Sequence, residues 1–383
     1  MLVTRIGLQN FRNYSNLDLE LSEGPTLLVG NNGQGKTNLV ESIYYLGNLG
    51  SHRVSTDQAL VKQGEEFAII RANVSNLDIA TLLEVQINRN GSNRAKINKQ
   101  EVPAKQLPRF ASVVLFAPED LVLVRGEPGS RRRFMDELLV RLKPRFGGIL
   151  SDYDRVLRQR NSLLKSSKGK IPTGGESTLE IWDEKLVELG SQIIWARAEL
   201  INYLQPEVTA AYSDVAGSTH TINLYPALSL LGATSIEDDD LTLVKDLDPE
   251  VLSEKFHERI VENRKAELER GVTLVGPHRD DLSIQLNGMP SRGYSSHGES
   301  WSLALALKLA SANLIKHDSL IGDPVLVLDD VFAELDESRR ERLAEAVLDF
   351  QQILVTAAVA KDVPLELSAR IVPIASGQVE PTN

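Results

Sequence analysis

The 383-residue sequence contains no cysteine. This absence excludes disulfide scaffolds, thiolate zinc sites, iron–sulfur clusters and cysteine nucleophiles. Aromatic residues make up only 5% of the chain, and no stretch of it approaches the roughly 18 consecutive apolar residues of a membrane-spanning helix. Residues 1–14 also lack the continuous apolar segment of a secretion signal. We therefore expect a cytoplasmic protein.

Acidic residues outnumber basic ones, 53 to 42, and the resulting net charge of −11 argues against a polyanionic partner such as DNA. The charge is unevenly distributed, however. Residues 125–170 contain thirteen Lys or Arg and five acids, a net charge of +8, which leaves −19 for the rest of the chain.

This basic stretch includes Arg131, Arg132 and Arg133, which we expect in the first turn of a helix, where the helix dipole disfavours cations. The three arginines are therefore candidates for binding DNA phosphates. A solvated helical face, or pairing with acids of neighbouring segments, would explain the same residues.

The periodicity of apolar residues divides the chain into three parts. Residues 1–118 are predicted to be mostly strands, with a hairpin at Asn90-Gly91, and residues 273–383 alternate strand and helix. Residues 119–272 have helical periodicity, including an apolar seam of about three heptads from Leu179 to Leu200. We predict one α/β domain formed by 1–118 and 273–383, with a mixed sheet and an antiparallel N-terminal sheet, and an inserted all-helical lobe at 119–272.

A glycine-rich segment matches the phosphate-loop pattern G-x-x-x-x-G-K-[ST], follows an apolar strand and precedes an apolar helix. Its residues are Gly30, Asn31, Asn32, Gly33, Gln34, Gly35, Lys36 and Thr37. The glycines allow backbone N–H groups to surround a polyphosphate, and the helix N-terminus adds its positive dipole. We expect ATP as the ligand, with Lys36 contacting the β- and γ-phosphates and Thr37 binding Mg²⁺.

Two acids, Asp329 and Asp330, follow the apolar run Val325–Leu328. Ligands of parallel sheets bind at the carboxyl ends of the strands, so these acids are expected beside the phosphate loop. Asp329 would hold Mg²⁺ through water, and Asp330 would orient or deprotonate the attacking water. On its own, the pair could equally be a strand that ends in solvated acids.

Ser296, Gly298 and Glu299 are predicted to begin a helix, and two interpretations explain these residues. Ser296 and Glu299 have capping-box spacing, which explains both residues without a ligand. The same helix start would direct a hydroxyl, a glycine N–H and the helix dipole at an anion. No pair of histidines has metal-ligand spacing, so we expect no bound metal other than Mg²⁺.

The order of these elements resembles the SMC/Rad50-like family of ABC-type ATPases, and among its members the bacterial mediators of recombinational repair. The resemblance spans essentially the whole chain and is carried by several segments: Asn10-Phe11-Arg12-Asn13-Tyr14, Phe116-Ala117-Pro118-Glu119-Asp120-Leu121, Gly276-Pro277-His278-Arg279-Asp280 and Asp329-Asp330-Val331-Phe332-Ala333-Glu334-Leu335-Asp336. It implies a P-loop ABC-type ATPase head, with Arg12 and Asn13 at the nucleotide. It also implies that Ser296, Gly298 and Glu299 contact the γ-phosphate bound to the opposite subunit.

The resemblance further implies an ATP-dependent homodimer that binds DNA at gaps or single-strand to double-strand junctions. Such a protein helps to load RecA together with RecR and RecO, and supports the SOS response. The chain departs from the family pattern at two places. Glu299 replaces a glutamine, which should change ATP-driven dimer affinity or hydrolysis unless its side chain turns back into the capping box. Thr356, Ala357 and Ala358 stand where many cassette ATPases have a histidine, which predicts slow hydrolysis. The alternatives are a chromosome-organising SMC-like head, which three heptads hardly support, a phosphotransferase and a transporter ATPase.

Overall fold

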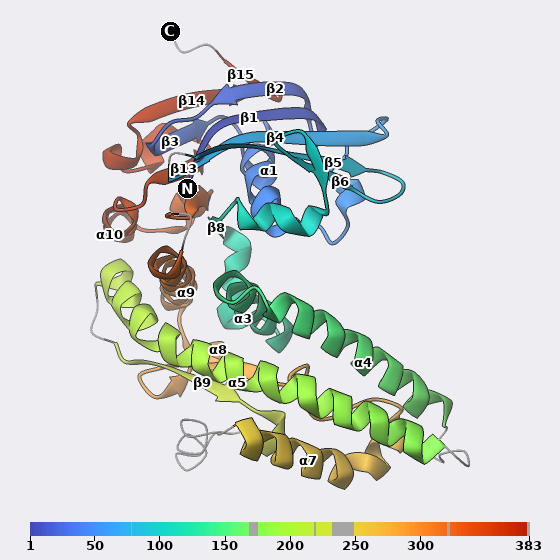
Figure 1. The fold of residues 1–383 in the computed structure, drawn as a ribbon. Coiled ribbons are helices and arrows are strands. Elements are labelled where there is room, and N and C mark those ends of the chain that lie inside the picture. Colours follow the sequence, from blue (N-terminus) through green and yellow to red (C-terminus); the bar gives the residue numbers. More distant parts are fainter. Residues whose placement is uncertain (78, 168–174, 218–219, 232–248, 320–321, 381–383) are drawn as a thin grey trace. The chain divides into compact units, whose positions relative to one another are not determined.

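The computed structural model describes residues 1–77, 79–167, 175–217, 220–231, 249–319 and 322–380 (Figure 1). The chain divides into two compact units. The first comprises Met1–Leu121, Ala210–Thr219 and His297–Asn383, and the second Val122–Thr209 and His220–Ser296.

The first unit contains an antiparallel sheet with the strand order β2-β1-β4-β5-β6-β7. These strands are β1 (Leu2–Phe11), β2 (Tyr14–Glu20), β4 (Phe67–Asn76), β5 (Ile79–Asn88), β6 (Arg94–Ile97) and β7 (Gln100–Val102). The predicted hairpin at Asn90-Gly91 is confirmed, because β5 and β6 pair with Leu83 opposite Ile97 and Val85 opposite Ala95.

The second sheet of this unit has the order β15-β14-β3-β13-β12-β8, and all its pairings are parallel except that of β15 with β14. Its strands are β3 (Gly24–Val29), β8 (Val113–Phe116), β12 (Val325–Asp329), β13 (Gln352–Ala357), β14 (Arg370–Ala375) and β15 (Gln378–Val379). Because β3, β12 and β13 run in the same direction, their carboxyl ends meet at one edge of the sheet. The phosphate loop and the paired acids lie at this edge.

The described part of the first unit contains the helices α1 (Lys36–Asn48), α9 (His297–Asp318) and α10 (Glu337–Val347), together with the end of α5 (Gly175–Ala216) from Ala210 onward. Apolar residues of α1 and of both sheets belong to one hydrophobic core. Short 3₁₀ segments complete the unit: η1 (Asp57–Leu60), η2 (Ala104–Arg109), η3 (Pro118–Leu121), η5 (Val331–Glu334), η6 (Ala360–Asp362) and η7 (Leu365–Leu367). Across the described residues, no helix combines the length and hydrophobicity that a membrane crossing requires.

The second unit is mainly helical. Its elements are α2 (Val122–Arg125), α3 (Pro128–Leu142), α4 (Phe146–Ser166), most of α5 (Gly175–Ala216), β9 (Ile222–Ala227), η4 (Ser229–Leu231), α7 (Pro249–Arg270), β10 (Asp281–Leu286), β11 (Met289–Pro290) and α8 (Ser291–Tyr294). The predicted apolar seam lies on α5, where Leu186, Leu189 and Ile193 are buried in a core shared with α4 and α7. The seam therefore packs within its own unit and forms no projecting coiled coil.

The units differ from the predicted domains in three ways. Their outer boundaries fall after Leu121 and after Ser296 instead of at 118 and 272, and Ala210–Thr219, inside the predicted insertion, belongs to the first unit. The inserted unit is also not purely helical, because it contains the antiparallel sheet β11-β10-β9. Strand β10 lies within residues 273–383, predicted from the sequence to belong to the α/β domain, but it pairs with β9 of the insertion.

Candidate nucleotide-binding site

The phosphate loop connects the end of β3 to the start of α1, as the sequence predicts. Gly33 and Gly35 have φ values of 82° and 118°, in the region that favours glycine. At Gly30 a Cβ atom would lie 2.1 Å from the carbonyl oxygen of Ile374 on β14. The glycines of the motif are therefore required by backbone conformation at two positions and by a close backbone approach at the third.

The side chain of Lys36 lies within the loop. Its Nζ donates hydrogen bonds to the carbonyl oxygens of Gly30, at 2.6 Å, and Asn31, at 3.2 Å. Burial lowers the pKa of Lys36, and the carboxylates of Asp330 and Asp329 act in the opposite direction. A largely buried ammonium at a helix N-terminus fits the negative charge of a polyphosphate.

Thr37 and Asp329 face each other across this edge of the sheet. The Thr37 hydroxyl donates to Asp329 Oδ1 at 3.0 Å, and the Thr356 hydroxyl donates to the same oxygen at 2.6 Å. Burial raises the pKa of the Asp329 carboxyl, whereas the hydrogen bonds from Thr356 and Thr37 lower it. A hydroxyl and a carboxylate are hard oxygen ligands, which is the chemistry that Mg²⁺ prefers beside a phosphate.

No cluster of three or more His, Cys, Asp or Glu side chains able to hold a metal ion occurs among the described residues. This finding is compatible with Mg²⁺ at Thr37 and Asp329, because Mg²⁺ is commonly bound by one or two protein oxygens, with waters and substrate phosphates as its other ligands.

Asp330 begins the turn after β12 and has a left-handed backbone conformation, with φ of 56°. Its backbone N–H donates to the Thr356 hydroxyl at 3.0 Å. The two acids predicted from the sequence are therefore brought beside the phosphate loop, and a third side chain, that of Thr356, contacts both residues.

Arg12 and Asn13 lie next to the loop, at the turn between β1 and β2. Asn13 Nδ2 donates to the carbonyl oxygen of Gln34 at 3.0 Å. The Arg12 guanidinium forms a bidentate ion pair with Glu41 of α1, with distances of 2.7 and 2.8 Å. These contacts fix the loop and α1, and direct contact of Arg12 or Asn13 with a nucleotide stays a prediction.

The turn between β14 and β15 also holds the phosphate loop, which sequence reasoning missed. The backbone N–H groups of Ser376 and Gly377 donate to the side chain and main chain of Gln34, at 2.5 and 2.9 Å. Both turn residues have positive φ, 49° and 72°, as a tight hairpin requires. The sequence signal was the pair Ser376-Gly377, which indicates a turn but does not reveal its partner.

Residues 296–299, which the resemblance predicts to contact the γ-phosphate of the opposite subunit, form the signature segment and lie at the start of α9. A Cβ atom on Gly298 would lie 2.4 Å from Arg339 Nη1 on α10, and His297 Nε2 lies 3.9 Å from Glu334 Oε2. The start of α9 therefore packs against the segment that follows the two acids. Contacts of Ser296, Gly298 and Glu299 with a nucleotide stay a prediction.

The three candidate DNA-binding arginines have different environments. Arg131 is only 4% exposed and forms a bidentate ion pair with Asp281, with distances of 2.7 and 2.8 Å. Arg132 is partly buried and donates to the carbonyl oxygen of Asp280 at 2.7 Å, whereas Arg133 is exposed. The Arg131 guanidinium is therefore buried and paired in this structure, and contact of the three arginines with DNA stays a prediction.

One expectation about this region needs correction. The helix α3 begins at Pro128, a residue favoured at the first helical position, so Arg132 and Arg133 lie beyond its first turn. Acids elsewhere in the second unit offset the basic stretch, because the whole unit contains 23 Lys and Arg against 26 Asp and Glu, a net charge of −3. Of the thirteen basic residues at 125–170, Lys168 and Lys170 lie outside the described residues.

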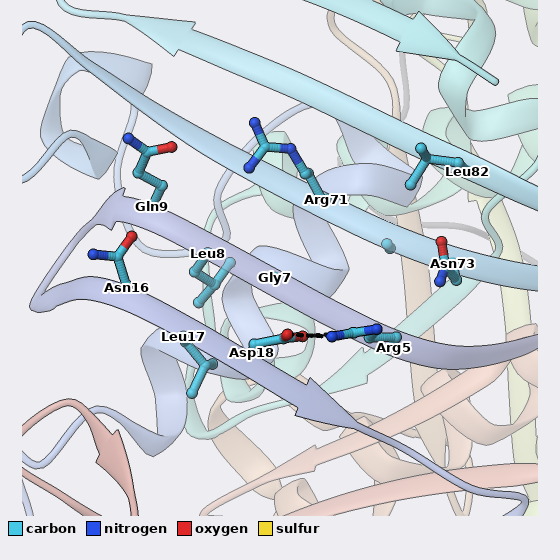
Figure 2. A pocket seen from close by; sticks show the side chains of 11 residues that line it. Arg5, Gly7, Leu8, Gln9, Asn16, Leu17, Asp18, Arg71, Asn73 and Leu82 are labelled. Carbon is cyan, nitrogen blue, oxygen red and sulfur yellow. Dashed lines mark hydrogen bonds and ion pairs between the residues drawn. The ribbon is translucent and has the colours of Figure 1, made fainter. Parts of the chain in front are cut away.

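A separate hollow of about 510 Å³ lies on the outer face of the antiparallel sheet (Figure 2). Its lining includes Gly7, Gln9, Asn16 and Asn73. Its two arginines are both paired, Arg5 with Asp18 and Arg71 with Glu84. The hollow is distinct from the phosphate loop, whose centre is filled by the lysine side chain.

A phosphate loop beside an acidic strand end, in a unit that combines a largely parallel and an antiparallel sheet, defines the head of an ABC-type ATPase. The fold also resembles that of an SMC head bound to the C-winged helix domain of ScpA (14% identity, TM-score 0.56, 99% of this chain and 96% of that chain covered).

A model of the RecF/RecN/SMC N terminal domain family matches residues 2–374. Two curated relatives are called DNA replication and repair protein RecF. That of Clavibacter michiganensis subsp. michiganensis is 55% identical over 99% of this chain and 96% of its own, and that of Leifsonia xyli subsp. xyli is 51% identical over the whole of both. The chain therefore belongs to the RecF family.

Solved structures agree with this assignment. One, described as the recombination mediator protein RecF-ATPrS in the RecFOR pathway, is 30% identical, with a TM-score of 0.87, and the match covers 99% of this chain and 97% of that one. A second, of the same mediator described as RecF-ATP, is 31% identical with a TM-score of 0.86, covering 100% and 97% of the two chains.

Proposed function

We propose that this chain is a cytoplasmic ATPase of recombinational repair and replication, which binds ATP with Mg²⁺ and dimerises on DNA. The observation that carries the proposal is the meeting of Lys36, Thr37 and Asp329 at one sheet edge. The solved structures of RecF with ATP and with ATPrS support ATP as the ligand.

The residues at the sheet edge have complementary chemical roles. Lys36 binds the β- and γ-phosphates. Thr37 and, through water, Asp329 would hold Mg²⁺, which would supply neutralising charge at the phosphate oxygens. Asp330 orients a water molecule and accepts its proton. The water oxygen forms a bond to the γ-phosphorus, the bond from that phosphorus to the bridging oxygen breaks, and ADP leaves with the electron pair.

Hydrolysis by this site is slow and acts as a timer for release from DNA. The segment 356–358 supplies no imidazole for the γ-phosphate, and Glu299 adds an acid to the signature. The signature of one protomer, including Ser296 and Gly298, contacts the γ-phosphate held by the other protomer. ATP thus stabilises a dimer that recognises gaps or single-strand to double-strand junctions.

In the cell, this dimer helps to load RecA with RecR and RecO and supports the SOS response. The similarity to a mediator of the RecFOR pathway supports these partners. A chromosome-organising head is the weaker candidate, because the apolar seam of α5 is buried within its own unit instead of extending into an arm.

Sedimentation and DNA binding, measured together with ATP, with ADP and with a Lys36→Met variant, test the proposal. We expect ATP, but not ADP, to increase both dimer content and affinity for gapped DNA, and we expect the variant to show neither effect. The proposal is refuted if ATP changes neither oligomeric state nor DNA affinity of the native protein.

The DNA-binding surface can be tested in the same assay. Arg133→Glu should weaken DNA binding and reduce the slope of affinity against salt by about one phosphate contact, while ATP binding is retained. Arg270→Glu, an equal charge change at an exposed residue of α7 in the same unit, is the matched control. An equal effect of the two variants would indicate general electrostatics instead of a contact at Arg133.

A further inference from the structure

The side chain of Thr356 is fully buried on β13, directly opposite Asp329 in the parallel pairing with β12. Its hydroxyl makes two hydrogen bonds of different kinds. It donates its proton to Asp329 Oδ1 at 2.6 Å and accepts the backbone N–H of Asp330 at 3.0 Å. One oxygen atom therefore links the two acids that end β12.

The requirement for a hydroxyl at this place follows from the two bonds. A group that donates to a carboxylate and accepts from an amide at the same atom must be a hydroxyl, which serine and threonine provide. The bond to the Asp330 N–H also holds a residue with φ of 56°, a left-handed conformation that most residues other than glycine avoid and that aspartate and asparagine adopt more often than others. Without this bond, the turn that carries the Asp330 carboxylate would be held less firmly beside the phosphate loop.

The position of Asp329 depends on the same hydroxyl. Asp329 Oδ1 accepts from Thr356 on one side and from Thr37 of α1 on the other, so the carboxylate is held between β13 and the helix after the phosphate loop. A partner that orients a metal-binding carboxylate from behind commonly affects metal affinity or activity by 10- to 100-fold.

We propose that Thr356 is a positioning residue of the ATPase site, which aligns the Mg²⁺-binding Asp329 and the water-orienting Asp330 through a single hydroxyl. The inference rests on the proposed ATPase function. Thr356 acts through the two acids, because both of its observed hydrogen bonds go to these residues.

The test compares Thr356→Val, which keeps the shape and removes both hydrogen bonds, with Thr356→Ser, which keeps the hydroxyl. We expect Thr356→Val to lower kcat for ATP hydrolysis by roughly 10- to 100-fold and to raise the Mg²⁺ concentration for half-maximal activity, with little change in KM for ATP. Thr356→Ser should retain most of the native rate and the native Mg²⁺ dependence.

The chain offers a matched control on the neighbouring strand. Thr26 of β3 is equally buried, and its hydroxyl has no hydrogen-bond partner among the described residues. Thr26→Val therefore makes the same chemical change in the same sheet without touching the acids, and it should leave kcat and the Mg²⁺ dependence unchanged. Thermal unfolding of each variant shows whether the fold is retained, and Thr356→Ala replaces Thr356→Val if the latter does not fold.

Two results would overturn the inference while the native protein hydrolyses ATP. One is native kcat and Mg²⁺ dependence in Thr356→Val or its alanine replacement. The other is an equal loss in Thr356→Ser, which would show that the rate responds to any substitution at this buried position and not to the hydroxyl. Absence of ATP binding and hydrolysis in the native protein would instead refute the proposed function, so the two failures are distinguishable.

Discussion

The second unit contains a fully buried arginine, Arg160 of α4, whose removal should strongly destabilise that unit. Its guanidinium donates to Asp183 Oδ1 and Glu267 Oε2, both at 2.6 Å, and to the Thr273 hydroxyl at 2.7 Å. These bonds join α4 to α5, to α7 and to the loop after α7. Arg160→Leu would leave two buried carboxylates facing an apolar side chain.

The size of the effect follows from the bonds that survive. Asp183 keeps an ion pair with Arg264, and Glu267 keeps the backbone N–H of Leu274 at 2.8 Å. Asp183 thus retains a cationic partner, whereas Glu267 retains a backbone N–H and loses the arginine that neutralises it. Removing one partner of a buried ion pair costs about 3–5 kcal/mol. For a unit of this size, the midpoint of thermal unfolding should fall by roughly 6–20 °C.

Tryptophan fluorescence can follow the second unit by itself. Two of the three tryptophans, Trp182 and Trp195, lie on α5 in this unit, and the third, Trp301, lies on α9 in the other. In a Trp301→Phe background, urea unfolding therefore reports on the second unit. The free energy of unfolding in water is the quantity to compare between Arg160→Leu and its parent.

Arg155→Leu is the matched control on the same helix. The Arg155 side chain is 66% exposed and pairs with Asp152 at the surface, so its loss should change stability by no more than about 0.5 kcal/mol. If Arg160→Leu destabilises the second unit no more than Arg155→Leu does, the buried cluster does not hold the three helices together and the reasoning is refuted.

Two further predictions concern the phosphate loop and pH. In Gly30→Ala the new Cβ would lie 2.1 Å from the Ile374 carbonyl oxygen. This substitution should therefore abolish ATP binding, measured by calorimetry, and destabilise the first unit by about 1–3 kcal/mol. Native-like ATP binding would contradict the prediction. Burial lowers the pKa of His278 to about 4, so the unfolded chain takes up a proton on this histidine at a higher pH than the folded one. The free energy of unfolding of the second unit should therefore fall by up to about 3 kcal/mol as the pH falls from about 6.5 to 4. Burial raises the pKa of Asp280 to about 6, so this carboxyl acts in the opposite direction. The test compares the free energy of unfolding at pH 6.5 and pH 4 in the native protein and in His278→Asn, and the variant should lose less stability between the two.

The parts of the site that the sequence predicted are those encoded by contiguous residues. The loop from Gly30 to Thr37 carries its own glycines and its own lysine, and Asp329 directly follows a buried strand. In both cases the neighbouring residues also determine the secondary structure. The carboxyl ends of parallel strands then meet for geometric reasons, so the meeting of loop and acids could be predicted without knowing the fold in detail.

The parts that the sequence did not predict depend on contacts between distant residues. Thr356 follows Asp329 by 27 residues, and its role is visible only once β12 and β13 pair in register. Ser376 reaches Gln34 across 342 residues. Neither residue type is unusual for its local setting, a strand in one case and a hairpin turn in the other, so no local pattern identified the contact.

The charge of a segment predicts a binding surface only through the side chains that reach solvent. Within 125–170, Arg131 is buried against Asp281 and Arg160 against Asp183 and Glu267, acids that lie outside this segment. The excess of +8 therefore overstates the charge available to a phosphate backbone. The exposed cations of the described stretch are the ones that DNA could reach most directly: Arg125, Arg133, Arg145, Arg155, Arg158 and Lys165.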